Sequence, residues 1–303
     1  MKKFNDLQIS NLQNLSEELA IDVSFLEKDY YVTKLLYLLS DIENENFKLI
    51  FSGGTCLSKA YLIIKRFSED IDLRIQESKN SLREERRIFI DNIIKLINDN
   101  KDFKVISVKK EDTSHRIILN IEYGHIAENN QFLRPEIKLE LFFNPLKLKV
   151  EGKEILSLID RYMKNDKNTF NISCINVIEL AAEKYSALLW RTLYSNKETY
   201  EPTLIRHLYD LAMLKKEILS NKKLFKEILL DIYNQDKIKR DKHNKFDNIQ
   251  DAFKQLYLSL KNENKFKNFY QNFVQNMCYD TSNKTLSFEQ ALKALKEISN
   301  SVL

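Results

Sequence analysis

Glycine and proline are scarce in this sequence. Only 4 glycines and 3 prolines occur among 303 residues, which leaves little material for tight hairpins or long flexible linkers. We therefore expect helices to dominate the fold. Hydrophobic residues make up 43% of the chain and charged residues 30%, as in an ordinary globular protein with an ample core.

Cysteine and histidine are also few, and their spacing argues against several common sites. The 3 cysteines form no C-x-x-C pair, which predicts reduced and mostly buried thiols at Cys56, Cys174 and Cys278. The 4 histidines form no H-x-x-x-H or Cys/His cluster, so we expect no zinc site. The nucleophile motif G-x-S-x-G and the P-loop motif G-x-x-x-x-G-K-[ST] are absent as well.

Long apolar runs are missing too. No stretch approaches the roughly 20 apolar residues of a membrane span, and none follows the N-terminal MKKFNDLQIS. We therefore expect a soluble, cytoplasmic protein that does not bind membranes. The net charge of +4 is mildly basic. Residues 221–270 carry 12 basic and 7 acidic residues, most densely in KIKRDKHNK (237–245), which fits either a solvated surface or a patch that binds an RNA backbone.

The hydrophobic pattern divides the chain into three regions. Residues 1–44 are expected to be helical, with Ser24 and Glu27 in capping-box spacing. Residues 45–150 should form an α/β core, with strands at 47–52, 70–75, 103–109, 116–123 and 136–143 and helices at 55–65 and 81–99. Strand signals fade after Pro145. Residues 151–303 should form a helical domain, with amphipathic helices at 176–194 and 202–219.

Two of the glycines stand together in FSGGTCLSKAYLIIKRFSEDIDLRI (51–75). Gly53 and Gly54 lie between a predicted strand and a predicted helix, where a Gly-Gly turn lets backbone N–H groups approach an anion without interference from Cβ atoms. Thr55 would begin the helix and add a hydroxyl donor. This arrangement is typical of a phosphate cradle, although a Gly-Gly turn by itself is usually only a turn.

Two aspartates follow in the same stretch. Asp70 and Asp72 alternate along a predicted strand, so both side chains should point to the same face. Two such carboxylates repel unless a cation lies between them, and hard oxygen ligands favour Mg²⁺, or Mn²⁺ in its place. A D-x-D pair alone is often a solvated strand edge. The order of strand, Gly-Gly turn, helix and D-I-D strand nevertheless predicts a site for a metal ion and a triphosphate.

This order of elements resembles the DNA polymerase β-like nucleotidyltransferases, whose pattern is hG[GS], a spacer and DhDh. The spacer is slightly longer here than that general pattern allows. The run GGTCLSKAYLIIKRFSEDIDL is more similar to the AbiEii/MenT family of nucleotidyltransferase toxins. LEKDYYVTKLL (26–36), ELAAEKYSAL (179–188) and RHLYDLAML (206–214) resemble further motifs of that family, so the resemblance spans roughly residues 24–215.

The resemblance implies an α+β fold. A polymerase β-like core, with a mixed sheet flanked by helices, would lie between a helical N-terminal lead-in and a helical C-terminal domain. Lys184 would bind nucleotide phosphates, and Asp210 would orient Lys184 or the nucleotide. An alternative for Asp210 is a surface ion pair with Arg206. His207 departs from the family pattern, which usually has aspartate there.

Three further residues complete the predicted site. Glu140 alternates with apolar residues in EIKLELFF, and we predict it as a third metal-binding and catalytic carboxylate. Arg66 and Ser68 lie in the loop before the aspartates and are candidates for nucleotide binding.

The function that this resemblance implies is Mg²⁺-dependent transfer of NMP from an NTP to a hydroxyl acceptor, with release of pyrophosphate. The acceptor expected is RNA, above all tRNA, and the protein would be the toxin of a type IV toxin–antitoxin or abortive-infection system with an antitoxin encoded nearby. Two alternatives stay open. One is a degenerate module that only binds nucleotide or RNA, and the other is a nucleotidyltransferase acting on a protein or small molecule.

Overall fold

The computed structural model describes most of the chain. It covers residues 6–78, 81–111, 115–124, 130, 132–194, 202–239, 246, 248–279 and 286–303. The chain divides into two compact units, Met1–Ile175 and Asn176–Leu303. We refer to these as unit 1 and unit 2 and describe each by itself.

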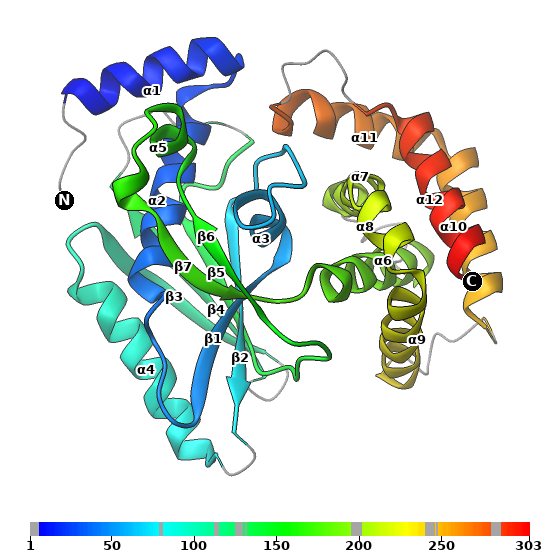
Figure 1. Ribbon diagram of the computed structural model, residues 1–303, viewed down its shortest axis with the longest axis horizontal. Helices are drawn as coiled ribbons and strands as arrows, with labels where there is room; N and C mark the ends of the chain where they lie inside the picture. The colour runs from blue at the N-terminus through cyan, green and yellow to red at the C-terminus, as the bar shows by residue number, and fades with distance from the viewer. Residues whose placement is uncertain are drawn as a thin grey trace. The chain divides into compact units, whose positions relative to one another are not determined.

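Unit 1 is built on a mixed sheet of 7 strands in the order β3-β4-β5-β2-β1-β7-β6 (Figure 1). The strands are β1 (Phe47–Ser52), β2 (Asp70–Glu77), β3 (Phe103–Glu111), β4 (Arg116–Tyr123), β5 (Ile137–Phe142), β6 (Glu151–Ile155) and β7 (Phe170–Cys174). β2 runs antiparallel to β1 and parallel to β5. The predicted mixed sheet is therefore confirmed, with the D-I-D segment at the start of the central strand.

The sheet extends further along the chain than the sequence indicated. β6 and β7 lie after Pro145, where strand signals fade, and β7 pairs in parallel with β1 through Phe51 and Cys174. Each strand has only 5 residues, and β6 contains Gly152 among charged residues at the sheet edge. Such a strand forms because its backbone pairs with a neighbour, which no local pattern reveals.

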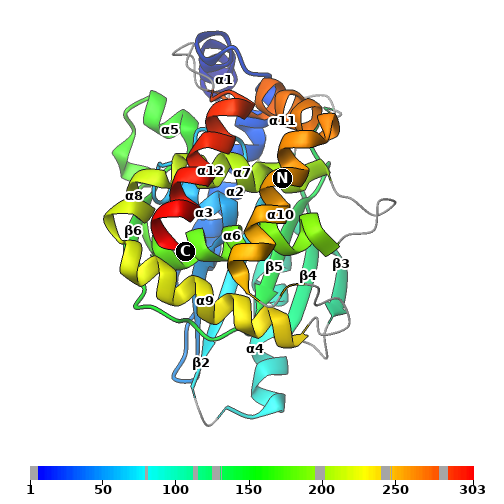
Figure 2. The same ribbon diagram turned by 90° about the vertical axis from the view of Figure 1, so that its right-hand side faces the viewer.

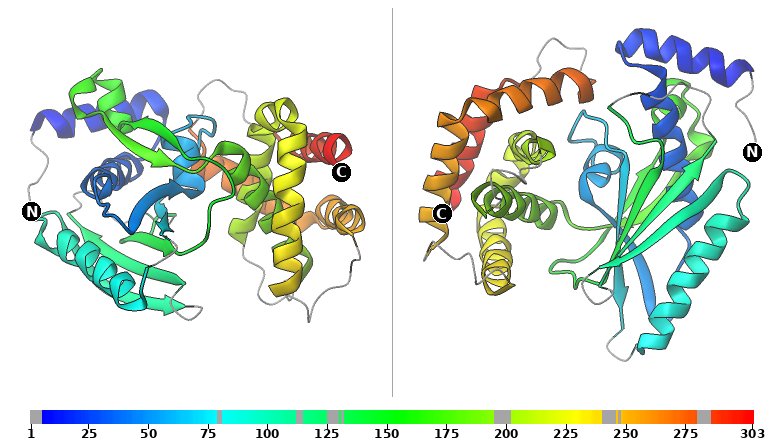
Figure 3. Two further views of the ribbon diagram at one scale, coloured as in Figure 1. Left: turned by 60° about the horizontal axis from the view of Figure 1, so that its bottom comes forward. Right: turned by 180° about the vertical axis from the view of Figure 1, so that it is seen from behind.

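Helices cover one face of this sheet. Figures 1 and 3 show α2 (Val23–Leu39) and α4 (Arg83–Asp99) on the same face. Phe47 of β1 stacks on Phe89 of α4 with ring centroids 4.9 Å apart, and Tyr31 of α2 lies 5.0 Å from Tyr123 of β4. Because side chains alternate along β2, this packing leaves Asp70 and Asp72 on the other face.

Shorter elements complete unit 1. α1 (Asp6–Leu19) and α5 (Leu158–Tyr162) pack near α2, η2 (Asp166–Asn168) precedes β7, and α3 (Gly53–Lys59) follows β1. The start of α2 corrects one expectation, because Asp22 rather than Ser24 caps it and accepts a hydrogen bond from the Ser24 N–H. Glu27 is buried inside the helix rather than part of a capping box.

Unit 2 is helical in the part of it that the structure describes (Figure 2). Its elements are α6 (Val177–Tyr194), η3 (Pro202–Ile205), α7 (Arg206–Met213), α8 (Lys215–Ser220), α9 (Lys222–Lys239), α10 (Ile249–Asn262), α11 (Asn264–Met277) and α12 (Phe288–Val302). The single helix expected at 202–219 is thus three consecutive elements. None of the described helices combines the length and apolarity that a membrane span needs.

Packing of large side chains fills the interior of unit 2. Trp190 of α6 stacks on Tyr233 of α9 at 5.2 Å, and the Tyr185 hydroxyl lies 2.7 Å from the Ser299 hydroxyl of α12. These contacts fix α6 against α9 and α12, so α6 holds its polar side chains in set positions.

Buried charges in unit 1 join helices α2 and α3. Lys59, at the end of α3, donates to the Asp29 carboxylate and to the Thr33 hydroxyl of α2, the latter at 2.7 Å. The second Asp29 oxygen accepts the Leu158 N–H at 2.8 Å. Burial lowers the pKa of Lys59, and Asp29 opposes that shift. Asp29 therefore fixes both the far end of α3, which begins at the glycine pair, and the start of α5.

Lys28, the residue before Asp29, joins α2 to the segments that contain Glu69 and Arg134. Its ammonium lies 3.3 Å from Glu69 and donates to the carbonyl groups of Arg134 and Glu136, the latter at 2.7 Å. Glu69 also accepts the Arg134 N–H at 2.8 Å. The E-K-D-Y run of α2 thus holds the segments on either side of the D-I-D strand.

Loss of the Asp29 carboxylate should be costly because it leaves the Lys59 ammonium buried without its counter-ion. We expect Asp29→Ala to lower the free energy of unfolding by about 3–5 kcal/mol in urea denaturation. The control is Glu43→Ala, which breaks the exposed pair with Lys48 and should cost at most about 1 kcal/mol. Equal costs for the two variants would contradict a structural role for the buried pair.

Candidate active site

The Gly-Gly turn brings the end of β1 against the start of β2. Gly53 has φ +75°, in the left-handed region that favours glycine. A Cβ atom at Gly53 would lie 1.8 Å from Asp72 Oδ2 and 2.6 Å from Asp72 Cγ. The Asp72 carboxylate therefore occupies the space that any side chain at position 53 would fill, and the turn and the D-I-D strand meet at this point.

The second glycine faces the loop that precedes the aspartates. A Cβ atom at Gly54 would lie 2.6 Å from Arg66 Nη2 and 3.1 Å from the Ser68 hydroxyl. Arg66 is buried and donates to the Phe67 carbonyl at 3.0 Å. Both predicted loop residues thus lie beside the Gly-Gly turn, and its second position leaves room for the guanidinium.

Two hydroxyl groups hold the turn against β2. The Thr55 hydroxyl is fully buried and donates to the Asp70 carbonyl, while the Ser52 hydroxyl donates to the Asp72 carbonyl at 3.0 Å. The Thr55 hydroxyl thus already serves the protein backbone. In this structure Thr55 positions the strand that carries the two carboxylates.

Asp70 is paired with an arginine that sequence reasoning missed. Arg134 Nη1 lies 2.6 Å from Asp70 Oδ1. Burial raises the pKa of Asp70 above its ordinary value, Arg134 opposes that shift, and the neighbouring Glu69 adds to it. No local pattern around Arg134 signals the contact, because the two residues lie 64 positions apart and meet only through tertiary structure.

Glu140 lies beside Asp72, since the two residues pair in register on β5 and β2. Its carboxylate accepts hydrogen bonds from Arg116 at 2.9 and 2.6 Å and from Lys138. Burial alone would raise the pKa of Glu140, but the bonds from Lys138 and Arg116 outweigh it and hold the pKa below its ordinary value. Glu140 is therefore an ionised carboxylate that is already neutralised by two cations.

Asp70, Asp72 and Glu140 remain the predicted ligands of a metal ion. In the described part of the chain, no three His, Cys, Asp or Glu side chains form a group that could hold a metal ion. Asp70 and Asp72 share one face of β2, and Asp70 lies in an environment where burial disfavours its charge. A divalent cation would relieve that cost, with its remaining ligands supplied by water and by substrate phosphates.

The other predicted residues lie in unit 2, where α6 and α7 bring two of them together. Lys184 Nζ lies 2.7 Å from Asp210 Oδ2, and the side chains are 7% and 0% exposed. Asp210 is therefore a buried partner of Lys184 and not a surface group, and the Arg206 guanidinium lies 6.0 Å from the Phe273 ring centroid. His125 and residues 240–245, which include most of the basic run and His243, lie outside the described residues.

Substitution of Gly53 tests the close approach of the turn to Asp72. We expect Gly53→Ala to destabilise the protein by about 1–3 kcal/mol, because alanine is strained at positive φ and its methyl group displaces the Asp72 carboxylate. Gly152→Ala is the matched control, since nothing lies within 4 Å of a Cβ there. Urea denaturation of the two variants checks this. If Gly53→Ala proved as mild as Gly152→Ala, the contact would not constrain the fold.

Comparison with known proteins finds a similar fold among solved structures. No curated protein sequence matches the chain. Among solved structures, the chain is similar to MenT4, a nucleotidyltransferase toxin of Mycobacterium tuberculosis H37Rv, with a TM-score of 0.57 and 17% identity over 99% of this chain and 98% of that one. A weaker likeness, with a TM-score of 0.28 and 12% identity over 97% of this chain and 76% of the other, is to the non-canonical poly(A) polymerase complex GLD-2–GLD-3.

The match to a protein family decides the classification. Residues 35–294 match the family described as nucleotidyl transferase AbiEii toxin of type IV toxin–antitoxin systems. That range includes the Gly-Gly turn, both aspartates and the Lys184–Asp210 pair. The chain therefore belongs to the AbiEii nucleotidyltransferase toxin family.

Proposed function

We propose that this protein transfers NMP from an NTP to a hydroxyl group of an RNA acceptor, with tRNA favoured, and releases pyrophosphate. Its biological role would be that of the toxin of a type IV system, opposed by an antitoxin encoded nearby and acting in the cytoplasm. The observation that carries the proposal is the contact between the Gly53 turn and the Asp72 carboxylate. It joins a side-chain-free turn to a carboxylate pair within one short stretch of chain.

Each residue of the site has a part in this reaction. Asp70 and Asp72 would hold Mg²⁺, or Mn²⁺ in its place, and the ion would orient the triphosphate and neutralise charge that develops at the reacting phosphorus. Gly53 and Gly54 would admit the phosphates close to the backbone, with Arg66 and Ser68 beside them. Thr55 positions the strand. Glu140, already bonded to Arg116 and Lys138, would fix those two cations at the site.

Residues of unit 2 complete the proposal. Lys184 would bind nucleotide phosphates, as a compact ammonium does well, and Asp210 would orient it through the 2.7 Å ion pair. A fully buried aspartate must keep a cationic partner. Asp210 therefore holds the Lys184 ammonium in one position, which is a positioning role.

Arg134 has a further part that follows from its contact with Asp70. Its Nη1 lies 2.6 Å from Asp70 Oδ1, an oxygen that a metal ion held by Asp70 would need. Its backbone is fixed by Glu69 and Lys28, but its side chain is 44% exposed and can rotate away. We assign Arg134 the role of neutralising Asp70 before the metal binds and contacting the triphosphate afterwards.

Substitution of Asp70 tests the catalytic role. With each labelled NTP, Mg²⁺ and total tRNA, the wild-type protein should transfer label, and Asp70→Asn should reduce the rate by about 100-fold or more. Burial raises the pKa of Asp70 in the folded protein, so the ionised carboxylate lowers the free energy of unfolding at pH values above its ordinary pKa. Asp70→Asn removes this charge and should therefore melt no lower than wild type at pH 7. This separates lost chemistry from lost folding.

Two results would decide against the proposal. Equal transfer by Asp70→Asn and wild type would exclude the catalytic role of the carboxylate pair. An absence of transfer by wild type to any RNA, together with NTP binding that needs no Mg²⁺, would favour the degenerate binding module. Transfer to a protein or small molecule but not to RNA would keep the chemistry and change the acceptor.

A separate variant tests Arg134. We expect Arg134→Gln to lower the Mg²⁺ concentration needed for half-maximal binding, measured by calorimetry without substrate, because a competing cation is removed. The same variant should raise KM for NTP by about tenfold with a smaller change in kcat. Arg87→Gln is the control, since Arg87 pairs only at the exposed surface with Glu84. Unchanged values for both Mg²⁺ binding and KM would refute the assignment.

A further inference from the structure

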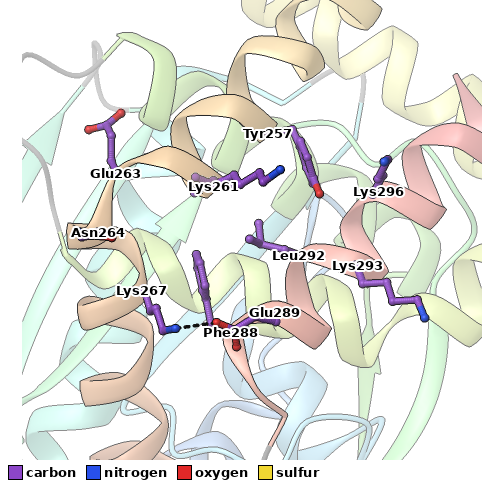
Figure 4. A pocket seen from close by; sticks show the side chains of 11 residues that line it. Tyr257, Lys261, Glu263, Asn264, Lys267, Phe288, Glu289, Leu292, Lys293 and Lys296 are labelled. Carbon is purple, nitrogen blue, oxygen red and sulfur yellow. Dashed lines mark ion pairs between the residues drawn. The ribbon is translucent and has the colours of Figure 1, made fainter.

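Unit 2 contains a groove that the proposed chemistry does not use. It has a volume of about 500 Å³ and lies between α10, α11 and α12 (Figure 4). Leu260, Phe288 and Leu292 line it and are buried. A space of this size is in the range of small-molecule sites, which are about 300–1,000 Å³.

The charge around this groove is positive. Lys261, Lys267, Lys293 and Lys296 line it together with Glu263 and Glu289. Both glutamates are neutralised, Glu289 by Lys267 at 2.8 Å and Glu263 by Lys265 at 2.7 Å. Lys261, Lys293 and Lys296 form no ion pair with any residue that the structure describes, so three exposed ammonium groups surround an apolar floor.

An aromatic ring lies among these cations. Tyr257 of α10 is half-buried, and Lys296 of α12 lies over its ring at 5.7 Å from the centroid. In Figure 4, Lys261 and Lys296 lie on the two sides of Tyr257. A stacking surface flanked by lysines is the arrangement that binds single-stranded nucleic acid, because bases stack on the ring and ammonium groups bind phosphates.

We propose that this groove binds a short single-stranded segment of the RNA acceptor. Lys261, Lys293 and Lys296 would contact its phosphates, and Tyr257 would stack on a base. The proposal rests on the proposed function insofar as the acceptor is RNA. An acidic protein segment fits the groove less well, because carboxylates would pair with the lysines but leave the tyrosine and the apolar floor without a flat partner.

Two charge-matched variants test this site in the full-length protein. The groove variant is Lys261→Gln/Lys293→Gln/Lys296→Gln, and the control is Lys222→Gln/Lys223→Gln/Lys226→Gln, which removes three exposed lysines of α9 that do not line the groove. Binding of a labelled single-stranded RNA is measured by fluorescence anisotropy at several KCl concentrations. The groove variant should bind at least about tenfold more weakly than the control and lose about 2 units of salt slope.

A neutral substitution separates stacking from charge. Tyr257→Ala should weaken RNA binding by about tenfold with no change in salt slope, and Tyr257→Phe, which keeps the ring, should bind like wild type. Thermal melting of every variant shows whether unit 2 remains folded. If Tyr257→Ala bound RNA as wild type does, the stacking role would be refuted.

The remaining outcomes distinguish this inference from the proposed function. Equal weakening in both triple variants would mean that only overall charge matters and would overturn the site. The site would also be overturned if the groove variant lost affinity for a polyglutamate peptide or for free ATP, tested alongside, but kept its affinity for RNA. Normal RNA affinity in the groove variant with intact label transfer refutes the groove alone. If the groove variant binds RNA more weakly than the control but the wild-type protein transfers no label, the groove is supported and the proposed transfer of NMP is refuted.

Discussion

The contact between the Gly53 backbone and the Asp72 carboxylate is the constraint on which the rest of the site depends. At φ +75°, with an aspartate oxygen where a Cβ would be, position 53 admits glycine alone without displacement. The contact sets the distance between β1 and the start of β2. Ser52 and Thr55 also donate to the Asp72 and Asp70 carbonyls, so hydrogen bonds join the turn to the strand that carries both carboxylates.

Buried charges as well as apolar contacts hold the surrounding segments. Lys28 and Asp29 are neighbours on α2, yet Lys28 binds the Glu69–Arg134 segment and Asp29 binds Lys59 of α3 and the N–H of Leu158. A buried ion pair adds little net stability, but each member has few acceptable partners. Lys28 and Asp29 therefore fix two different segments of unit 1, because each charge accepts only a partner of opposite charge or a polar backbone group. Leucine side chains do not discriminate between partners in this way.

The sequence revealed local features of this site and missed the distant ones. The Gly-Gly turn, the D-I-D strand and the helix at 81–99 have local patterns, so their positions were predicted within a few residues, whereas the helix expected at 55–65 is the shorter α3, Gly53–Lys59. Arg134 and the carbonyl partners of Lys28 have no local pattern, because Arg134 lies 64 positions from Asp70 and those carbonyl groups lie 106 and 108 positions from Lys28. β6 was missed for the same reason, since Gly152 and its charged neighbours give no strand signal. The link between Lys184 and Asp210 was predicted from family resemblance, and helical spacing alone could not show that Asp210 is fully buried.

The charges around Asp70 and Glu140 are balanced in two different ways. Burial makes the ionised form of Asp70 unfavourable, and Glu69 adds to that cost. The fold offsets it with an arginine that is anchored at its backbone but exposed at its guanidinium. Glu140, by contrast, holds two cations on a buried carboxylate. Under the proposed function, the exchangeable charge of the site would lie at Asp70, where movement of the Arg134 side chain would make room for a metal ion.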